Sequence, residues 1–187
     1  MKLGIRNIIV SCCLIFLFGC SPTVEKGNLY LGKVTRVLSG QAVEVHLTGT
    51  FEEVKVRIEG INAPDWRQDP WGAAAKQKLQ DLVLNKSIAI EAENLERDRY
   101  NRIRGHLWQR QTLVSQQLVE AGCVLANDKY THSYSKLLRS SQEYARLMGY
   151  GIWNPEQAMR YTPSQARAFP SAVKRRGEAV RSWGFPP

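Results

Sequence analysis

The sequence predicts an α+β fold, a five-stranded OB-fold β-barrel with about three α-helices packed on it. Three observations predict this class. Short segments with alternating apolar and polar residues follow one another with tight turns, as in a β-meander. A helical pattern comes after the third of these segments, and two more come after the fifth. The chain has 187 residues, 43% hydrophobic and 23% charged, which is the composition of an ordinary globular protein.

The first residues have the pattern of an export signal. Lys2 and Arg6 precede an apolar run over residues 8–18, which is shorter than the roughly 20 residues that a membrane-spanning helix needs. The run ends in Leu17-Phe18-Gly19-Cys20, which resembles the lipobox of bacterial lipoproteins. In those proteins the Cys thiol is lipidated and the peptide before it is removed. An ordinary signal peptide that happens to contain a Cys is the alternative.

We therefore expect a signal peptide over residues 1–19, a membrane anchor through lipid on Cys20, and a tether over residues 20–30. The protein would then lie in the cell envelope. Ser21 follows the lipidated position, where an Asp would imply retention in the inner membrane, so the outer membrane is favoured if the cell is Gram-negative. Cys123 is the only later cysteine, so the exported domain has no internal disulfide, and its apolar neighbours place it in the core.

The main domain is expected over residues 31–155, where regular elements follow in order. Alternation and turn residues predict five strands: 32–38, 42–48, 53–58, 87–91 and 105–108. Apolar residues at helical spacing predict three helices: 71–84, 112–121 with Thr112 as the cap, and 135–148. The segment between the third strand and Pro70 is expected to be a loop.

Residues 156–187 are expected to form a basic, flexible tail. From Arg160 onward the chain has six basic residues and one acid, Glu178. A short helix is expected near residues 172–183. The tail is either a solvated terminus or an arm that binds polyanions. Without the signal peptide the chain has 24 basic and 17 acidic residues, since Lys2 and Arg6 are removed. Such a charge attracts nucleic acid, anionic lipid or lipopolysaccharide, although a merely cationic protein would have it too.

Four blocks carry a resemblance to a known family. They lie in order along the chain: Val37–Val45, Val56–Asp65, Asp98–Arg102, and Leu138–Arg146 followed by Gly151-Ile-Trp153. They are similar to blocks of the staphylococcal nuclease (thermonuclease) family, which read V-x-D-G-D-T-x-x-V, R-L-x-G-I-D-x-P-E and D-x-Y-G-R before the closing helix. The resemblance implies an enzyme that cleaves phosphodiesters of DNA and RNA with one calcium ion, two arginines and a carboxylate.

The resemblance assigns catalytic roles to Arg57, Arg102 and Asp65. The two arginines match the phosphate clamp, because a planar guanidinium can donate two hydrogen bonds to phosphate oxygens. Asp65 matches the carboxylate that acts on water, although the family has the longer Glu there. Stabilisation of the charge that develops on the attacked phosphate is what lowers the barrier in such a site.

The calcium site that the resemblance implies has changed. Gln41 and Asn62 stand where the family has aspartates, and Ala63 replaces a Thr, although its backbone carbonyl could still serve as a ligand. Calcium affinity depends on the number of charged ligands, so we expect calcium binding to be weak or absent and nuclease activity to be lost or very weak. Asp69, Glu44 or Glu59 could supply a substitute ligand, and Glu44 is expected to face solvent. The sequence alone leaves open whether the protein is an enzyme.

We expect nucleic-acid binding to be retained even where nuclease activity is lost or very weak. Arg99 and Tyr100 match the family's basic and aromatic pair beside the nucleotide, and Tyr130 and Tyr134 lie near its other tyrosines. The expected partner is single-stranded DNA or RNA, or another polyanion, bound in a basic groove with aromatic platforms. The three histidines have no ligand-like spacing, and we predict no zinc site.

Three hypotheses from different classes follow. The leading one is a lipid-anchored binding domain with little or no nuclease activity. The second is an active endonuclease anchored in the envelope. The third is a structural module that docks an envelope protein or glycan. The sequence leaves the natural ligand and the oligomeric state open.

Overall fold

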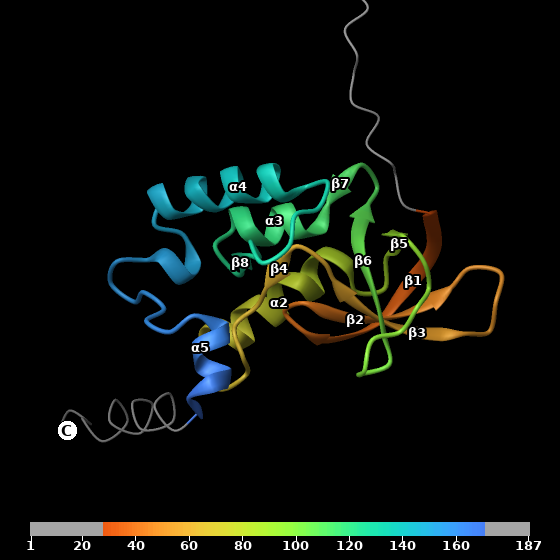
Figure 1. Ribbon diagram of the computed structural model, residues 1–187, viewed down its shortest axis with the longest axis horizontal. Coiled ribbons are helices and arrows are strands. Elements are labelled where there is room, and N and C mark those ends of the chain that lie inside the picture. Colours follow the sequence, from red (N-terminus) through yellow and green to blue (C-terminus); the bar gives the residue numbers. More distant parts are fainter. Residues whose placement is uncertain (1–27, 171–187) are drawn as a thin grey trace, which may run out of the picture.

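Five strands close into a barrel in the computed structural model, which describes residues 28–170. They are β1 (Asn28–Ser39), β2 (Ala42–Leu47), β3 (Glu53–Ile58), β5 (Ser87–Ala92) and β6 (Arg102–Gln109). Antiparallel neighbours follow the order β3-β2-β1-β5-β6, and a parallel pairing of β3 with β6 closes the barrel (Figure 1). The predicted α+β fold class with an OB-fold barrel is confirmed.

Three helices lie at the expected positions: α2 (Trp71–Val83), α3 (Val114–Glu120) and α4 (Ser135–Leu147). Helices α2 and α3 pack on strands of the barrel, and α4 packs on α3. Helices α3 and α4 lie side by side (Figure 1). Smaller elements complete the described chain: β4 (Ile61–Asn62), β7 (Thr112–Leu113), β8 (Leu125–Ala126), η2 (Gly151–Trp153) and α5 (Pro163–Ala168). No helix within residues 28–170 has an apolar stretch long enough to cross a membrane.

The core follows from strict alternation along the strands. In β3 the side chains of Val54, Val56 and Ile58 are at most 1% exposed, while the residues between them face outward. Helix α2 contributes a buried stripe that includes Leu79 and Val83. Each such aliphatic side chain contributes roughly 1.5–3 kcal/mol by leaving water. Half-buried Cys123 packs against this core, as the sequence indicates, and burial raises the pKa of its thiol.

Two element boundaries and the exposure of one acid differ from the sequence-based expectations. Strand β1 begins at Asn28, inside the expected tether, because residues 28–33 pair with β5. Thr112 belongs to the short strand β7, so Leu113 and not Thr112 is the N-cap of α3. Glu44 is 9% exposed rather than solvent-facing, because its carboxylate receives two hydrogen bonds from Arg36, at 2.6 and 2.8 Å.

The expected flexible tail is also corrected in its first part. Residues 163–168 form α5, with Pro163 and Ala166 buried. The helix starts with a capping box in which Thr162 and Gln165 satisfy each other's backbone N–H groups, and Pro163 occupies a position early in the first turn, where proline is favoured. The expected helix near 172–183, the signal peptide, Cys20 and most of the tether lie outside the described residues.

Candidate nucleic-acid site

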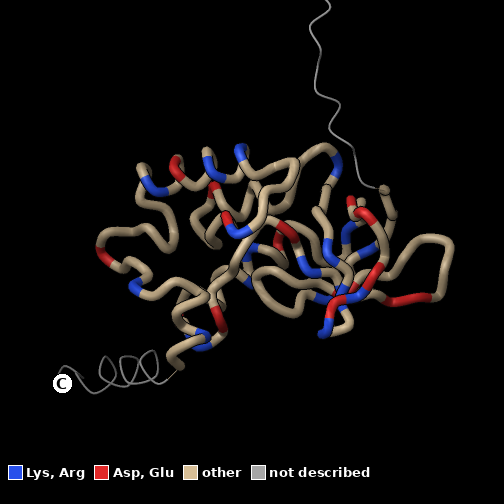
Figure 2. Tube along the Cα trace, viewed as in Figure 1, with Lys and Arg blue, Asp and Glu red and all other residues tan. Residues whose placement is uncertain are grey.

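Barrel closure places basic residues side by side on the outer face. In the parallel pairing of β3 with β6, Lys55 lies opposite Arg102 and Arg57 opposite Arg104. All four alternate with core residues, so they share the outward face of the sheet. Figure 2 shows blue and red segments close together around this part of the barrel and the loop between β5 and β6. The acids there offset part of the repulsion between the arginines.

A pocket of about 520 Å³ opens over this face. It is lined by residues from β3, the turn after it, the β5–β6 loop, β6 and the segment after β8: Arg57, Ile58, Glu59, Gly60, Asp98, Arg99, Tyr100, Arg102, Arg104, Asn127, Tyr130 and His132. The four arginines and two acids give the lining a formal charge of +2. A concave, cationic pocket with aromatic rings suits a phosphate and a stacked base.

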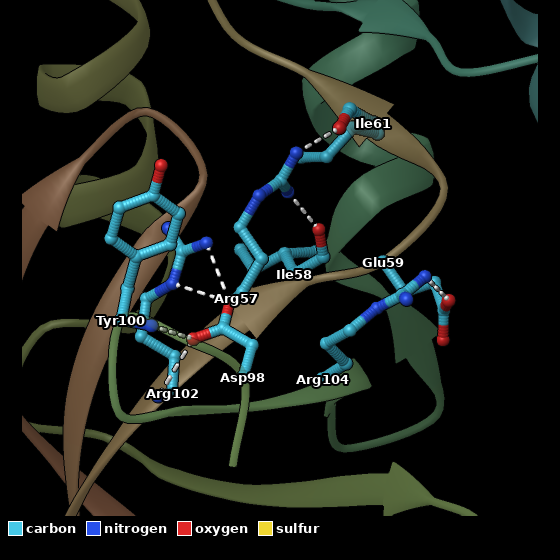
Figure 3. A network of polar contacts seen from close by, with 8 residues as sticks. All are labelled: Arg57, Ile58, Glu59, Ile61, Asp98, Tyr100, Arg102 and Arg104. Atoms are coloured by element: carbon cyan, nitrogen blue, oxygen red, sulfur yellow. Dashed lines mark hydrogen bonds and ion pairs between the residues drawn. The ribbon is translucent and has the colours of Figure 1, made fainter. Parts of the chain in front are cut away.

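The Arg57 side chain is half-buried and held by backbone carbonyls. Its Nη1 donates to the carbonyl of Ile58, and its Nη2 donates to that of Ile61 at 2.8 Å (Figure 3). Burial, together with the charges of Arg102, Arg167 and Arg104, lowers the pKa of Arg57 to about 10. The guanidinium is therefore still charged at neutral pH, and within residues 28–170 its hydrogen bonds go to backbone carbonyls and not to a carboxylate.

Arg102 is held by a carboxylate instead. Its Nε and Nη2 both donate to Oδ2 of Asp98, at 3.0 and 2.7 Å. The other oxygen of Asp98 accepts from the backbone N–H groups of Tyr100 and Arg102, so the same acid also shapes the loop. Arg104 pairs in the same way with Glu59, at 2.6 Å (Figure 3). Each guanidinium has five N–H donors, so donors remain for a phosphate.

Three of the four residues expected to contact the nucleic acid line the pocket. Arg99 and Tyr100 are exposed on the β5–β6 loop, and the guanidinium carbon of Arg99 lies 4.8 Å from the Tyr100 ring centre. Tyr130 also lines the pocket and is 68% exposed. Aromatic rings exposed in a basic pocket are the usual platforms for bases.

Tyr134 is the exception, and its expected role is corrected. It is half-buried, packs against the core, and donates from its hydroxyl to Glu91 at 2.7 Å. Its ring meets His106 edge to face, with centres 4.7 Å apart. It is absent from the pocket lining. The sequence could not show this, because the buried acceptor Glu91 is distant along the chain.

The expected calcium ligands lie together, but their oxygens are engaged. Oε1 of Gln41 accepts from the backbone N–H of Ala63 at 2.7 Å, and Oδ1 of Asn62 accepts from Arg167 at 2.7 Å. Within residues 28–170 no group of three or more His, Cys, Asp or Glu side chains could hold a metal ion. Two neutral amides that already accept protein hydrogen bonds do not fit a calcium site, which depends on carboxylates.

The proposed substitute ligands do not complete that set. Glu44 is paired with Arg36, Glu59 with Arg104, and Asp69 is exposed. Asp65 is held by Arg67, whose Nε donates to Oδ1 at 2.8 Å. Burial raises the pKa of Asp65, but the hydrogen bonds from Arg67 and the charges of Arg67 and Arg167 outweigh it, so this pKa is lowered. Asp65 is therefore a weaker base than an ordinary Asp, and its Oδ1 already accepts a hydrogen bond from Arg67.

Helix α5 contacts Asn62 at the expected metal position, which the sequence patterns did not indicate. Oδ1 of Asn62 binds Arg167, and Nδ2 of Asn62 donates to the hydroxyl of Ser164 at 3.2 Å. Buried Gln68 holds the same segment, since its Nε2 donates to the carbonyl of Tyr161 at 2.7 Å. The signal that could have found α5 is the capping-box pattern Thr162-Pro163-Ser164-Gln165.

A closed β-barrel with packed helices and an arginine-lined pocket at the seam defines a protein of the nuclease-like OB-fold class. The family model of staphylococcal nuclease homologues matches residues 55–155. The chain belongs to the staphylococcal nuclease family. It is 24% identical over 142 residues to the thermonuclease of Staphylococcus hyicus, covering 72% of this chain and 82% of that protein. It is 26% identical over 146 residues to the thermonuclease of Staphylococcus intermedius, covering 73% and 82%.

Proposed function

We propose that this domain binds single-stranded nucleic acid, or another polyanion, at the pocket over β3 and β6, with nuclease activity lost or very weak. The observation that carries the proposal is the contrast between the arginines of the pocket and the residues at the expected metal and water-activating positions next to β3. The guanidinium groups of Arg57 and Arg102 are held in place with donors to spare, while the amides at the metal positions and the carboxylate of Asp65 are engaged by protein donors.

Binding follows from the charge of the pocket. A phosphate that enters meets fixed N–H donors from Arg57 and Arg102, and charge-assisted hydrogen bonds of this kind are roughly twice as strong as neutral ones. Tyr100 and Tyr130 are exposed aromatic rings in the pocket lining, where bases could stack. Stacking of each base on an aromatic ring adds about 1–3 kcal/mol without strong sequence preference.

Hydrolysis needs more than this pocket supplies. Water must be oriented or deprotonated beside the phosphate, and Asp65, the residue that the resemblance assigns to this step, is shorter than the family's Glu and bound to Arg67. A displacement of about 1 Å can lower a rate on the order of a hundredfold. Calcium is the metal to test, because the family uses it.

The test is binding and cleavage measured on one sample. The full chain, purified in an uncharged detergent, is titrated into fluorescent single-stranded DNA, with calcium and with EDTA. We expect binding that weakens with salt and about tenfold weaker binding for Arg102→Ala. Arg139→Ala, on the exposed face of α4, is the matched control. The alternative is an active envelope nuclease, which is supported by the presence of Arg57, Asp65 and Arg102 at the family's catalytic positions. Calcium-dependent cleavage that is lost in Arg57→Ala would favour this alternative.

The envelope location is proposed from the lipobox alone. We infer that lipid on Cys20 anchors the domain to a membrane, with the outer membrane favoured in a Gram-negative cell. Labelling cells with a radioactive fatty acid tests this directly. Label should enter the wild-type chain and not Cys20→Ser, and the variant should leave the membrane fraction. Equal labelling of both would contradict the anchor.

A further inference from the structure

The contact between α5 and the former metal position carries a further inference, which rests on the proposed phosphate-binding function. We propose that Arg167 supplies the positive charge that a divalent cation would supply in this cleft, so that ligand binding is independent of metal. The phosphate-binding surface is then built from three guanidinium groups, those of Arg57, Arg102 and Arg167.

Geometry places the Arg167 side chain at this position. Its Nη2 lies 2.7 Å from Oδ1 of Asn62, the oxygen that would otherwise be free to face a cation. Asn62 lies in β4, directly after the turn that follows β3, and its Nδ2 binds Ser164 of the same helix. Asn62 is therefore clamped to α5 through both ends of its amide. A metal ion and the guanidinium would compete for the same oxygen and would repel each other.

The docking of α5 is built into the fold. Gln68 is 3% exposed and bridges two segments, since its Oε1 accepts from the backbone N–H of Asp65 and its Nε2 donates to the carbonyl of Tyr161. Ala166 is buried on the inner side of α5, whereas Arg167 is exposed. The helix is thus fixed to the loop that holds Asp65, and Arg167 keeps access to a ligand from solvent.

Because residue 62 is an amide and not a carboxylate, Arg167 can supply the positive charge at this position. A carboxylate at position 62 would form an ion pair with the guanidinium and cancel its charge. The neutral amide of Asn62 orients the guanidinium through a hydrogen bond and leaves its charge in place. Arg167 acts on the existing clamp, because its charge is among those that lower the pKa of Arg57. A phosphate between these groups would relieve that repulsion.

The first arm of the test measures binding to single-stranded oligothymidylate by the full chain. EDTA and calcium should leave the wild-type affinity unchanged. Arg167→Ala should weaken binding about tenfold and lower the slope of log affinity against log salt by about 0.7, the value for one phosphate contact on a single strand. Arg160→Ala removes the same charge from an exposed position just before α5 and should change the affinity by less than about twofold.

The second arm measures calcium directly by titration calorimetry and needs no nucleic acid. Gln41→Asp with Asn62→Asp should bind calcium poorly while Arg167 is present, and adding Arg167→Ala should improve calcium affinity at least about tenfold. Circular dichroism of each variant checks that it is folded.

The outcomes separate the two proposals. No binding of oligothymidylate by the wild type, or binding that Arg102→Ala leaves intact, overturns the proposed function, and the calcium arm still tests Arg167. Arg102-dependent binding that Arg167→Ala leaves unchanged or strengthens overturns the role of Arg167 alone, as does tight calcium binding by the wild type. Strengthened binding would mean that α5 covers the pocket instead of completing it.

Discussion

Replacing Asp98 tests whether one acid holds the pocket together. Its carboxylate accepts four hydrogen bonds, from the backbone N–H groups of Tyr100 and Arg102 at 2.8 and 3.1 Å, and from two nitrogens of the Arg102 side chain at 3.0 and 2.7 Å. Asp98→Ala removes all four. The backbone bonds contribute about 1 kcal/mol each, and a partly exposed ion pair up to about 1 kcal/mol. The free energy of unfolding should therefore fall by about 2–3 kcal/mol.

Asp98→Asn is the matched control, because its amide oxygen still accepts from the two backbone N–H groups while the charge is lost. It should cost about 1 kcal/mol or less. Urea unfolding, followed by tryptophan fluorescence, gives both values as shifts of the midpoint at unchanged slope. We expect the two backbone hydrogen bonds of the loop to contribute more to stability than the ion pair. Equal decreases in the free energy of unfolding in the two variants would refute this. A loss below about 0.5 kcal/mol in Asp98→Ala would refute the whole argument.

The pH dependence gives a second check on the same residue. Burial raises the pKa of Asp98, but hydrogen bonds from Arg102 and from backbone N–H groups outweigh this, and the pKa is lowered. The contribution is therefore complete above the unfolded-state pKa of about 4 and is lost as the pH falls through the folded-state pKa. The difference between wild type and Asp98→Ala should be constant near neutral pH and shrink below about pH 4. A difference that grows in acid would contradict the assignment.

Three further predictions concern the surroundings of the site. Gly40→Ala should lower the free energy of unfolding by about 1–3 kcal/mol, because the new Cβ would lie 2.6 Å from that of Ala75; an unchanged thermal midpoint would contradict this. Burial lowers the pKa of His106 to about 4. The free energy of unfolding should therefore fall by up to about 3 kcal/mol as the pH drops from 6.5 towards 4. In His106→Phe the dependence of this free energy on pH should become weaker; an unchanged dependence would contradict the role of His106. Gln68→Leu should remove the hydrogen bond to Tyr161 and speed hydrogen exchange in α5 relative to α4; equal exchange in wild type and variant would show that α5 is held by other contacts.

The sequence predicts the barrel because each strand carries its own alternation. In β3 the pattern Val54-x-Val56-x-Ile58 determines which residues enter the core, and Arg57 must then face outward. Arg102 was found through a motif, not through alternation, since the expected strand began at residue 105. The structure shows that β6 begins at Arg102 itself. That extension, with the parallel register of β3 against β6, brings the two arginines to one face.

The parts that the sequence did not predict depend on partners far away in the chain. Tyr134 resembles a ligand-binding tyrosine until its hydroxyl is seen to bind Glu91, 43 residues earlier. Arg167 lies in a basic segment whose composition favours a tail, and its partner Asn62 is 105 residues away. Local patterns determine which residues form a strand or a helix, but they do not determine which surface a short helix covers.

The pocket is under electrostatic strain that a ligand can relieve. Arg102 and Arg104 each have an acid partner, Asp98 and Glu59, whereas Arg57 is held by carbonyl oxygens and is repelled by its arginine neighbours, which contribute to lowering its pKa to about 10. The charged form of Arg57 is therefore less favourable in the fold than in water, and the domain gives up stability to keep it. A phosphate beside Arg57 would reverse the sign of that interaction, so a bound polyanion should raise both the pKa of Arg57 and the stability of the domain. The half-buried position of Arg57 beside other arginines, at the seam where the barrel closes, therefore favours an anionic ligand there.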